Sequence, residues 1–84
     1  MDSNDIKQLI ETKLPGVAAL VESDDNVHFA AIVIGTLFNG MPPLKRHQAV
    51  YQALGDKVGR EIHALSLQTH TPAEWEEKTG TGTR

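Results

Sequence analysis

The sequence predicts an α+β fold in which helices pack on a three-stranded mixed sheet, with elements in the order α-β-β-α-β-α. Two apolar runs, residues 17–22 and 27–34, flank a short polar turn, and a third apolar run occupies residues 62–69. Apolar residues recur at intervals of three or four positions in residues 3–14 and 43–54, which predicts two amphipathic helices.

The first helix, residues 3–14, begins after a good N-cap residue, either Asp2 or Ser3. Pro15-Gly16 ends it. The helix places one apolar stripe toward the core: Ile6, Leu9, Ile10 and Leu14.

The two strands that follow form a predicted hairpin, because only the polar cluster Ser23-Asp24-Asp25-Asn26 separates them. The second strand is apolar on both faces, which is typical of a central strand covered on both sides. The chain then leaves the sheet, with Phe38 still expected in the core.

The second helix, residues 43–54, starts with Pro42-Pro43, since the first helical positions do not need an N–H donor. Gly55 can end it. A helix between the second and third strands allows them to pair in parallel through a right-handed crossover. The polar connection that follows, residues 56–60, has room for one helical turn.

A short helix follows the third strand. Thr71 is its expected N-cap, Pro72 its first residue and Glu74 its first-turn acid. We expect Trp75 to anchor this helix in the core. The predicted organisation is a single domain over residues 1–78 and a flexible tail over residues 79–84, which offers nothing to bury.

The composition of the 84-residue chain limits its chemistry. It contains no cysteine, so the chain supplies no disulfide, thiolate metal ligand or cysteine nucleophile. A net charge of −3 gives no sign of general nucleic-acid binding. The acidic start lacks the features of a signal peptide, and the longest apolar run is too short to span a membrane, so a soluble cytoplasmic domain is expected.

Two histidines stand where the second and third strands begin. His28 opens one strand and His63 opens the other, so parallel pairing would bring both to the same end of the sheet. A lone histidine beside an apolar run is more often a surface or satisfied core residue than a ligand. His47 is interpreted as a helix-surface residue and His70 as structural. A zinc site is disfavoured because the histidines lack the close spacing of zinc ligands.

Basic residues cluster in one turn of the second helix, and Lys57 and Arg60 follow in the next connection. Such a cluster is usually solvated, but it is also a candidate surface for a partner or for nucleic acid. Its members are Lys45, Arg46, His47 and Lys57. The sequence contains no recognisable catalytic triad, phosphate loop or carboxylate pair, so an enzyme is not expected.

Several short stretches, in order and with compatible spacing, make the chain resemble the BolA family, and within it the bacterial branch called IbaG. The resemblance covers residues 6–75. The stretches are His28-Phe29, Leu37-Phe38-Asn39-Gly40-Met41, Gln48-Ala49-Val50-Tyr51, Ile62-His63-Ala64-Leu65-Ser66 and Thr71-Pro72-Ala73-Glu74-Trp75.

This resemblance implies a fold like the class II KH domain and partnership with a monothiol glutaredoxin around a shared 2Fe–2S cluster. It also implies that His63 is the principal cluster ligand, with His28 as the second. Two imidazoles can replace two thiolates on one iron, as in Rieske centres. A glutaredoxin cysteine and a glutathione thiol would hold the other iron. Imidazole ligation would make the site pH-sensitive, because protonated histidine does not bind metal.

The alternative function is a DNA-binding regulator, which has been proposed for related family members. The nucleic-acid loop of RNA-binding KH domains needs Gly-x-x-Gly with basic residues. The corresponding segment here, Gly55 to Gly59, has three intervening residues, one of them an acid. The two functions differ in their requirements: the first needs His63 and a partner, and the second needs the basic residues and weakens with salt.

Overall fold

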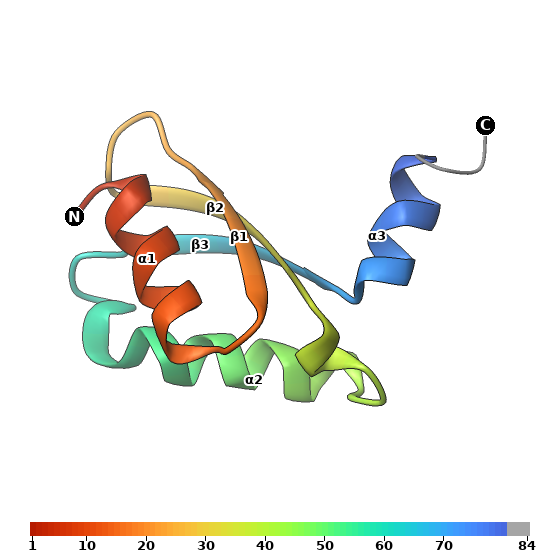
Figure 1. The fold of residues 1–84 in the computed structure, drawn as a ribbon. Helices are drawn as coiled ribbons and strands as arrows, with labels where there is room; N and C mark the ends of the chain where they lie inside the picture. The colour runs from red at the N-terminus through yellow and green to blue at the C-terminus, as the bar shows by residue number, and fades with distance from the viewer. Residues whose placement is uncertain (81–84) are drawn as a thin grey trace.

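The computed structural model describes residues 1–80 and confirms the predicted α+β order (Figure 1). The helices are α1 (Ser3–Lys13), α2 (Pro43–Leu54) and α3 (Pro72–Thr79), and the strands are β1 (Val17–Glu22), β2 (His28–Gly35) and β3 (Ala64–His70). The described residues also form two short 3-10 helices, η1 (Thr36–Phe38) and η2 (Gly55–Lys57).

The three strands form one mixed sheet in the order β1-β2-β3. β1 and β2 pair antiparallel, with Ala19 opposite Val33. β2 and β3 pair in parallel, with His28 opposite Ala64. Gly35 ends β2 opposite Val17, where a larger residue would crowd its partner: a Cβ at Gly35 would lie 2.6 Å from Cγ1 of Val17.

The core lies on one face of this sheet, beneath α1 and α2 (Figure 1). Phe38 is fully buried in it, as predicted. The other members are Ile6, Ile10, Ala19, Phe29, Val33, Val50, Leu54 and Ile62.

The opposite face of the sheet is largely open, which corrects the expectation that β2 is covered on both sides. β2 is the central strand, but Ala30 is exposed and Ile32 is half-buried. Leu20 of β1, which pairs with Ile32, is 52% exposed. Residues 1–80 form only two long helices that could cover the sheet, and both pack on the other face.

The element boundaries differ from the predicted ones mainly at β3, which begins at Ala64 rather than residue 62. Ile62 instead forms a bridge with Val58, and its N–H donates to the carbonyl of Lys57 at 2.9 Å. This tight turn carries Ile62 into the core, where it is fully buried. An apolar run cannot by itself distinguish such a turn from the start of a strand.

The helix caps follow the sequence closely. Asp2, one of the two predicted candidates, caps α1 in a reciprocal capping box with Asp5. Gly55 ends α2 with a φ of 61°, a left-handed conformation that favours glycine. Thr71 caps α3 in a second capping box with Glu74.

α3 is held differently from the prediction, because Trp75 is not a core anchor. α3 has no buried residue, and it stands at the end of the sheet rather than against the core (Figure 1). Trp75 packs against the ring of His70, with centroids 5.3 Å apart. The firmer link is Arg46 of α2, which donates two hydrogen bonds to the Glu74 carboxylate, at 2.6 and 3.1 Å.

The predicted tail, residues 79–84, falls mostly outside the described residues, which end at 80. Thr79 belongs to α3, and Gly80 is its C-cap. None of the helices formed by residues 1–80 is both long enough and apolar enough to cross a membrane.

The Arg46–Glu74 link should make the attachment of α3 sensitive to acid. Hydrogen bonds from Arg46 and from the Thr71 N–H lower the pKa of Glu74 from 4.5 to about 2. A lowered pKa in the folded state stabilises the fold above the unfolded-state pKa, and this contribution is lost as the pH falls toward 2. Glu74→Gln should therefore lower the urea midpoint at pH 7, with a deficit that shrinks from pH 4.5 downward.

The single tryptophan, Trp75, lies on α3, so its fluorescence follows the attachment of this helix. Glu77→Gln, which removes an exposed acid from the same helix, is the matched control and should leave the midpoint unchanged. An equal deficit for Glu74→Gln at pH 7 and at pH 2.5 would contradict the assignment.

Candidate functional site

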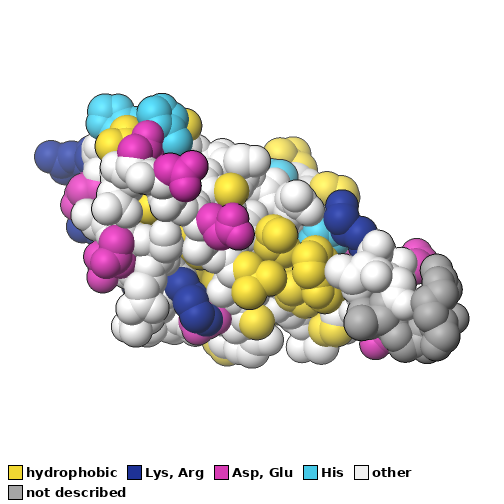
Figure 2. All heavy atoms as spheres, turned by 90° about the horizontal axis from the view of Figure 1, so that it is seen from above, with side chains coloured by type: hydrophobic (Ala, Val, Ile, Leu, Met, Phe, Trp, Pro, Cys, Tyr) yellow, Lys and Arg dark blue, Asp and Glu magenta, His cyan; other side chains and the backbone are white. Residues whose placement is uncertain are grey.

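The sheet brings His28 and His63 together at the end where β2 and β3 begin. The His63 N–H donates to the carbonyl of Val27 at 3.0 Å, and His28 pairs with Ala64. The two histidines are therefore diagonal neighbours on two adjacent segments of the same chain, and neighbouring strands lie about 5 Å apart. Figure 2 shows two histidine side chains next to each other at one end of the molecule, with acidic side chains beside them.

The position of His63 follows from the turn that precedes it. Ile62 is fully buried and fixes the chain to the core, whereas the next residue, His63, is exposed. The backbone hydrogen bond to Val27 then ties His63 to the start of β2. A buried neighbour and a backbone bond hold its main chain while the ring stays open to solvent.

The position of His28 follows from the β1–β2 turn. Ser23 Oγ donates to the carbonyl of His28 at 2.6 Å and accepts the N–H of Asn26 at 2.9 Å. Asn26 has a φ of 59°, the left-handed conformation that Asn tolerates better than most residues. His28 lies on the open face of the sheet, and its side chain is 68% exposed.

Asp25 is a residue of this site that sequence analysis assigned only to the turn. Its Oδ1 accepts the N–H groups of Val27 and His28 at 3.0 and 2.9 Å, and its Oδ2 lies 2.8 Å from Nδ1 of His28. The His28 N–H, the His28 ring and the Val27 N–H hold the pKa of Asp25 well below its ordinary range. An Asp whose side chain accepts the N–H two residues further on, here that of Val27, forms a recognisable Asx turn.

These two histidines fit the metal chemistry implied by the sequence. Both residues are exposed at the same end of the sheet, and the imidazole nitrogens of histidine are common metal ligands. Within residues 1–80, no three His, Cys, Asp or Glu side chains are grouped to hold a metal ion. The pair would therefore supply half of a cluster's ligands, and a partner would have to supply the rest.

The predicted basic surface is not one patch. Arg46 is only 9% exposed, and it is engaged by Glu74 and by the carbonyl of Met41. Its neighbours, Lys45 and His47, point to different sides, because consecutive helical residues do not share a face. Lys57 lies beyond the other end of α2, about 18 Å along the helix from Lys45, and its Nζ is 3.4 Å from Glu61.

The other two histidines lie at the far end of the sheet. His47 and His70 line a hollow between α2, the end of β3 and α3, together with Arg46, Glu74 and Lys78. Burial lowers the pKa of His70, and the charge of Lys78 adds to this effect. The four histidines are thus divided into two pairs at opposite ends of the strands.

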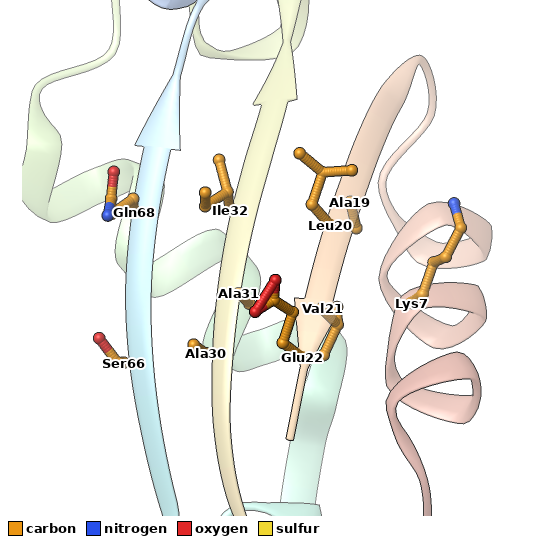
Figure 3. A pocket seen from close by; sticks show the side chains of 10 residues that line it. All are labelled: Lys7, Ala19, Leu20, Val21, Glu22, Ala30, Ala31, Ile32, Ser66 and Gln68. Carbon is orange, nitrogen blue, oxygen red and sulfur yellow. The ribbon is translucent and has the colours of Figure 1, made fainter. Parts of the chain in front are cut away.

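A second hollow lies on the open face of the sheet. Figure 3 shows the side chains that line it, with Leu20, Ile32 and Gln68 contributed by the three strands in turn. The lining is mainly aliphatic, and its Lys7 is paired with Glu11 at 2.6 Å. This surface is suited to contact with another apolar surface rather than to acid–base chemistry.

Comparisons with known proteins agree with this architecture. The family described as BolA-like protein matches residues 10–74. The acid stress protein IbaG of Escherichia coli K12 is 37% identical over 76 residues, covering 89% of each chain. A BolA homologue of known structure from Coxiella burnetii is 45% identical, with a TM-score of 0.81, and the match covers 90% of this chain and 97% of that one.

Two further similarities are partial. The DNA-binding transcriptional regulator BolA of Vibrio cholerae is 40% identical over 50 residues, which cover 60% of this chain and 47% of the regulator. The chain spans about half the length of BolA-like protein 1 from mouse and human, 51% and 53% respectively. The family match covers most of the sequence, and the solved relative shares the fold. The chain therefore belongs to the BolA family.

Proposed function

We propose that the chain is a non-catalytic cytoplasmic adaptor that pairs with a monothiol glutaredoxin and ligates a shared 2Fe–2S cluster through His63 and His28. Its role would lie in iron–sulfur cluster trafficking or iron homeostasis. The observation that carries the proposal is the pair of exposed imidazoles at one sheet edge, in a chain without cysteine.

The division of ligands follows from this donor set. His63 and His28 would hold one iron through imidazole nitrogens, and the thiols of the glutaredoxin and of glutathione would hold the other. Bound in this way, the cluster is cargo that can be passed on. This chain would supply two imidazole nitrogens, from residues whose backbone is held in place by hydrogen bonds. The partner and glutathione would supply the remaining ligands.

The open face of the sheet is the surface that we propose the glutaredoxin covers. His28 lies on this face, and the exposed Leu20 and half-buried Ile32 lie on the same side of the strands. A protein that reaches the histidines would gain apolar contact there. This differs from the basic turn of α2, where Arg46 is already paired within the chain.

Reconstitution with a monothiol glutaredoxin, glutathione, iron and sulfide tests the proposal. Visible absorption and circular dichroism should show a complex whose spectrum differs from that of the glutaredoxin homodimer. His63→Ala should abolish this spectrum, and His28→Ala should weaken or alter it. His47→Ala, which removes a histidine from the opposite end of the sheet, should leave it unchanged.

Because His63 and His28 are exposed, both alanine variants should keep the far-ultraviolet spectrum and urea midpoint of the wild type. A wild-type protein that forms no complex and leaves the glutaredoxin spectrum as it was would refute the adaptor function. An equal loss in all three histidine variants would refute the assignment of the ligands.

A second candidate function, DNA binding, is favoured by the likeness to the Vibrio cholerae regulator and by the exposed Lys45. The pairing of cations within the chain argues against it: Lys7 with Glu11, Arg46 with Glu74, Lys57 with Glu61 and Arg60 with Asp56. In an acidic chain, these four paired cations have less free charge to neutralise phosphates.

Salt dependence separates the two functions. A complex held by metal–ligand bonds should survive an increase from about 50 to 200 mM salt, because few counterions are released when it forms. If the chain bound duplex DNA through the basic residues, affinity should fall steeply over the same range, and Lys45→Gln should reduce the slope by about 1. We expect the first behaviour and only weak, salt-sensitive DNA binding in a fluorescence-anisotropy titration.

A further inference from the structure

The ring of His28 faces a carboxylate from the turn before its own strand, with Asp25 Oδ2 2.8 Å from His28 Nδ1. We propose that Asp25 is a positioning residue, which keeps the proton of the neutral ring on Nδ1 and leaves Nε2 as the nitrogen that binds metal. This inference rests on the proposed function, since it specifies how one of its two ligands is prepared.

Asp25 is itself fixed by the backbone. Its Oδ1 accepts two main-chain N–H groups, those of Val27 and His28, at 3.0 and 2.9 Å. Ser23 closes the same turn through its bond to the His28 carbonyl. An exposed ion pair between two freely moving side chains is worth little. Here the two backbone hydrogen bonds hold the Asp25 carboxylate independently of the His28 ring. Only the ring then loses freedom of movement when the contact forms.

The chemistry of the contact decides the tautomer. An ionised carboxylate has no proton to give, so the nitrogen that faces it must carry the proton. In a neutral imidazole the other nitrogen then has a free lone pair. Histidines that bind metals commonly donate their second N–H to a carboxylate, which fixes the tautomer and the ring orientation and makes the ligating nitrogen more basic.

The two candidate ligands are therefore not equivalent. Within residues 1–80, the ring of His63 has no hydrogen-bond partner, whereas the His28 ring is oriented before any metal arrives. No other charged side chain of this part of the chain forms an ion pair or hydrogen bond with the His28 ring. Asp24, the exposed acidic residue that precedes Asp25 in the sequence, makes no such contact with the His28 ring.

The variant Asp25→Asn tests this directly, because it should keep the turn and reverse the tautomer. The amide oxygen of Asn would still accept the two main-chain N–H groups, since its NH₂ group cannot. That NH₂ group would then face Nδ1 as a donor, and the ring proton would move to Nε2. Asp24→Asn removes the same charge one residue away and is the matched control.

The tautomer is read from the histidine-labelled isolated protein by long-range ¹H–¹⁵N correlation at about pH 8.5, above the ordinary titration range of histidine. We expect the Nδ1–H form of His28 in the wild type and in Asp24→Asn, and the Nε2–H form in Asp25→Asn. With glutaredoxin and cluster present, Asp25→Asn should weaken cluster retention by about 10–100-fold, while Asp24→Asn should match the wild type.

The two readouts keep the inference separate from the proposed function. A wild-type ring that is mainly Nε2–H, or a tautomer unchanged in Asp25→Asn, overturns the role of Asp25 whether or not a cluster forms. A reversed tautomer with unchanged cluster retention also overturns it as a positioning role for ligation. Failure of the wild type to form any cluster complex, with the tautomers as expected, refutes the adaptor function instead.

Discussion

The parallel pairing of β2 with β3 is the constraint on which the rest of the molecule depends. Its register sets His28 opposite Ala64 and joins His63 to Val27 through one hydrogen bond, so two residues 35 positions apart in the sequence become neighbours. The same pairing requires a crossover, and α2 supplies it while covering the core. Moving this register by one residue would turn the core-facing side of β3 outward.

The one-sided core follows from the small size of the chain. A domain of 84 residues has limited apolar surface to bury, and here it is concentrated beneath α1 and α2. Ile62 belongs to that core although it lies outside any strand, and it immobilises the backbone that carries His63. Core packing and the placement of His63 are therefore linked through one peptide bond, where a buried side chain is directly followed by an exposed one.

The element order, both long helices and the common end of His28 and His63 could be predicted from the sequence, because periodicity and strand connection encode them. The roles of Arg46 and Trp75 could not. In the sequence, Arg46 is one of several cations in a basic turn. Only the packing of α3 shows that it binds the carboxylate of Glu74, 28 residues away. A tryptophan is an obvious core candidate, but the core is formed by other residues and Trp75 is only half-buried. Asp25 was visible as a turn residue, whereas its contact with a ring depends on side-chain geometry.

The distance between α3 and the end of the sheet that carries His28 and His63 has a practical consequence for handling the protein. β3 is seven residues long, so α3 begins about 23 Å from the edge where His63 lies. A surface, dye or solid support joined through α3 would leave the opposite edge facing solution. Immobilised in this orientation, the chain would present His28 and His63 to molecules in solution, and α3 would serve as a spacer between the support and the sheet.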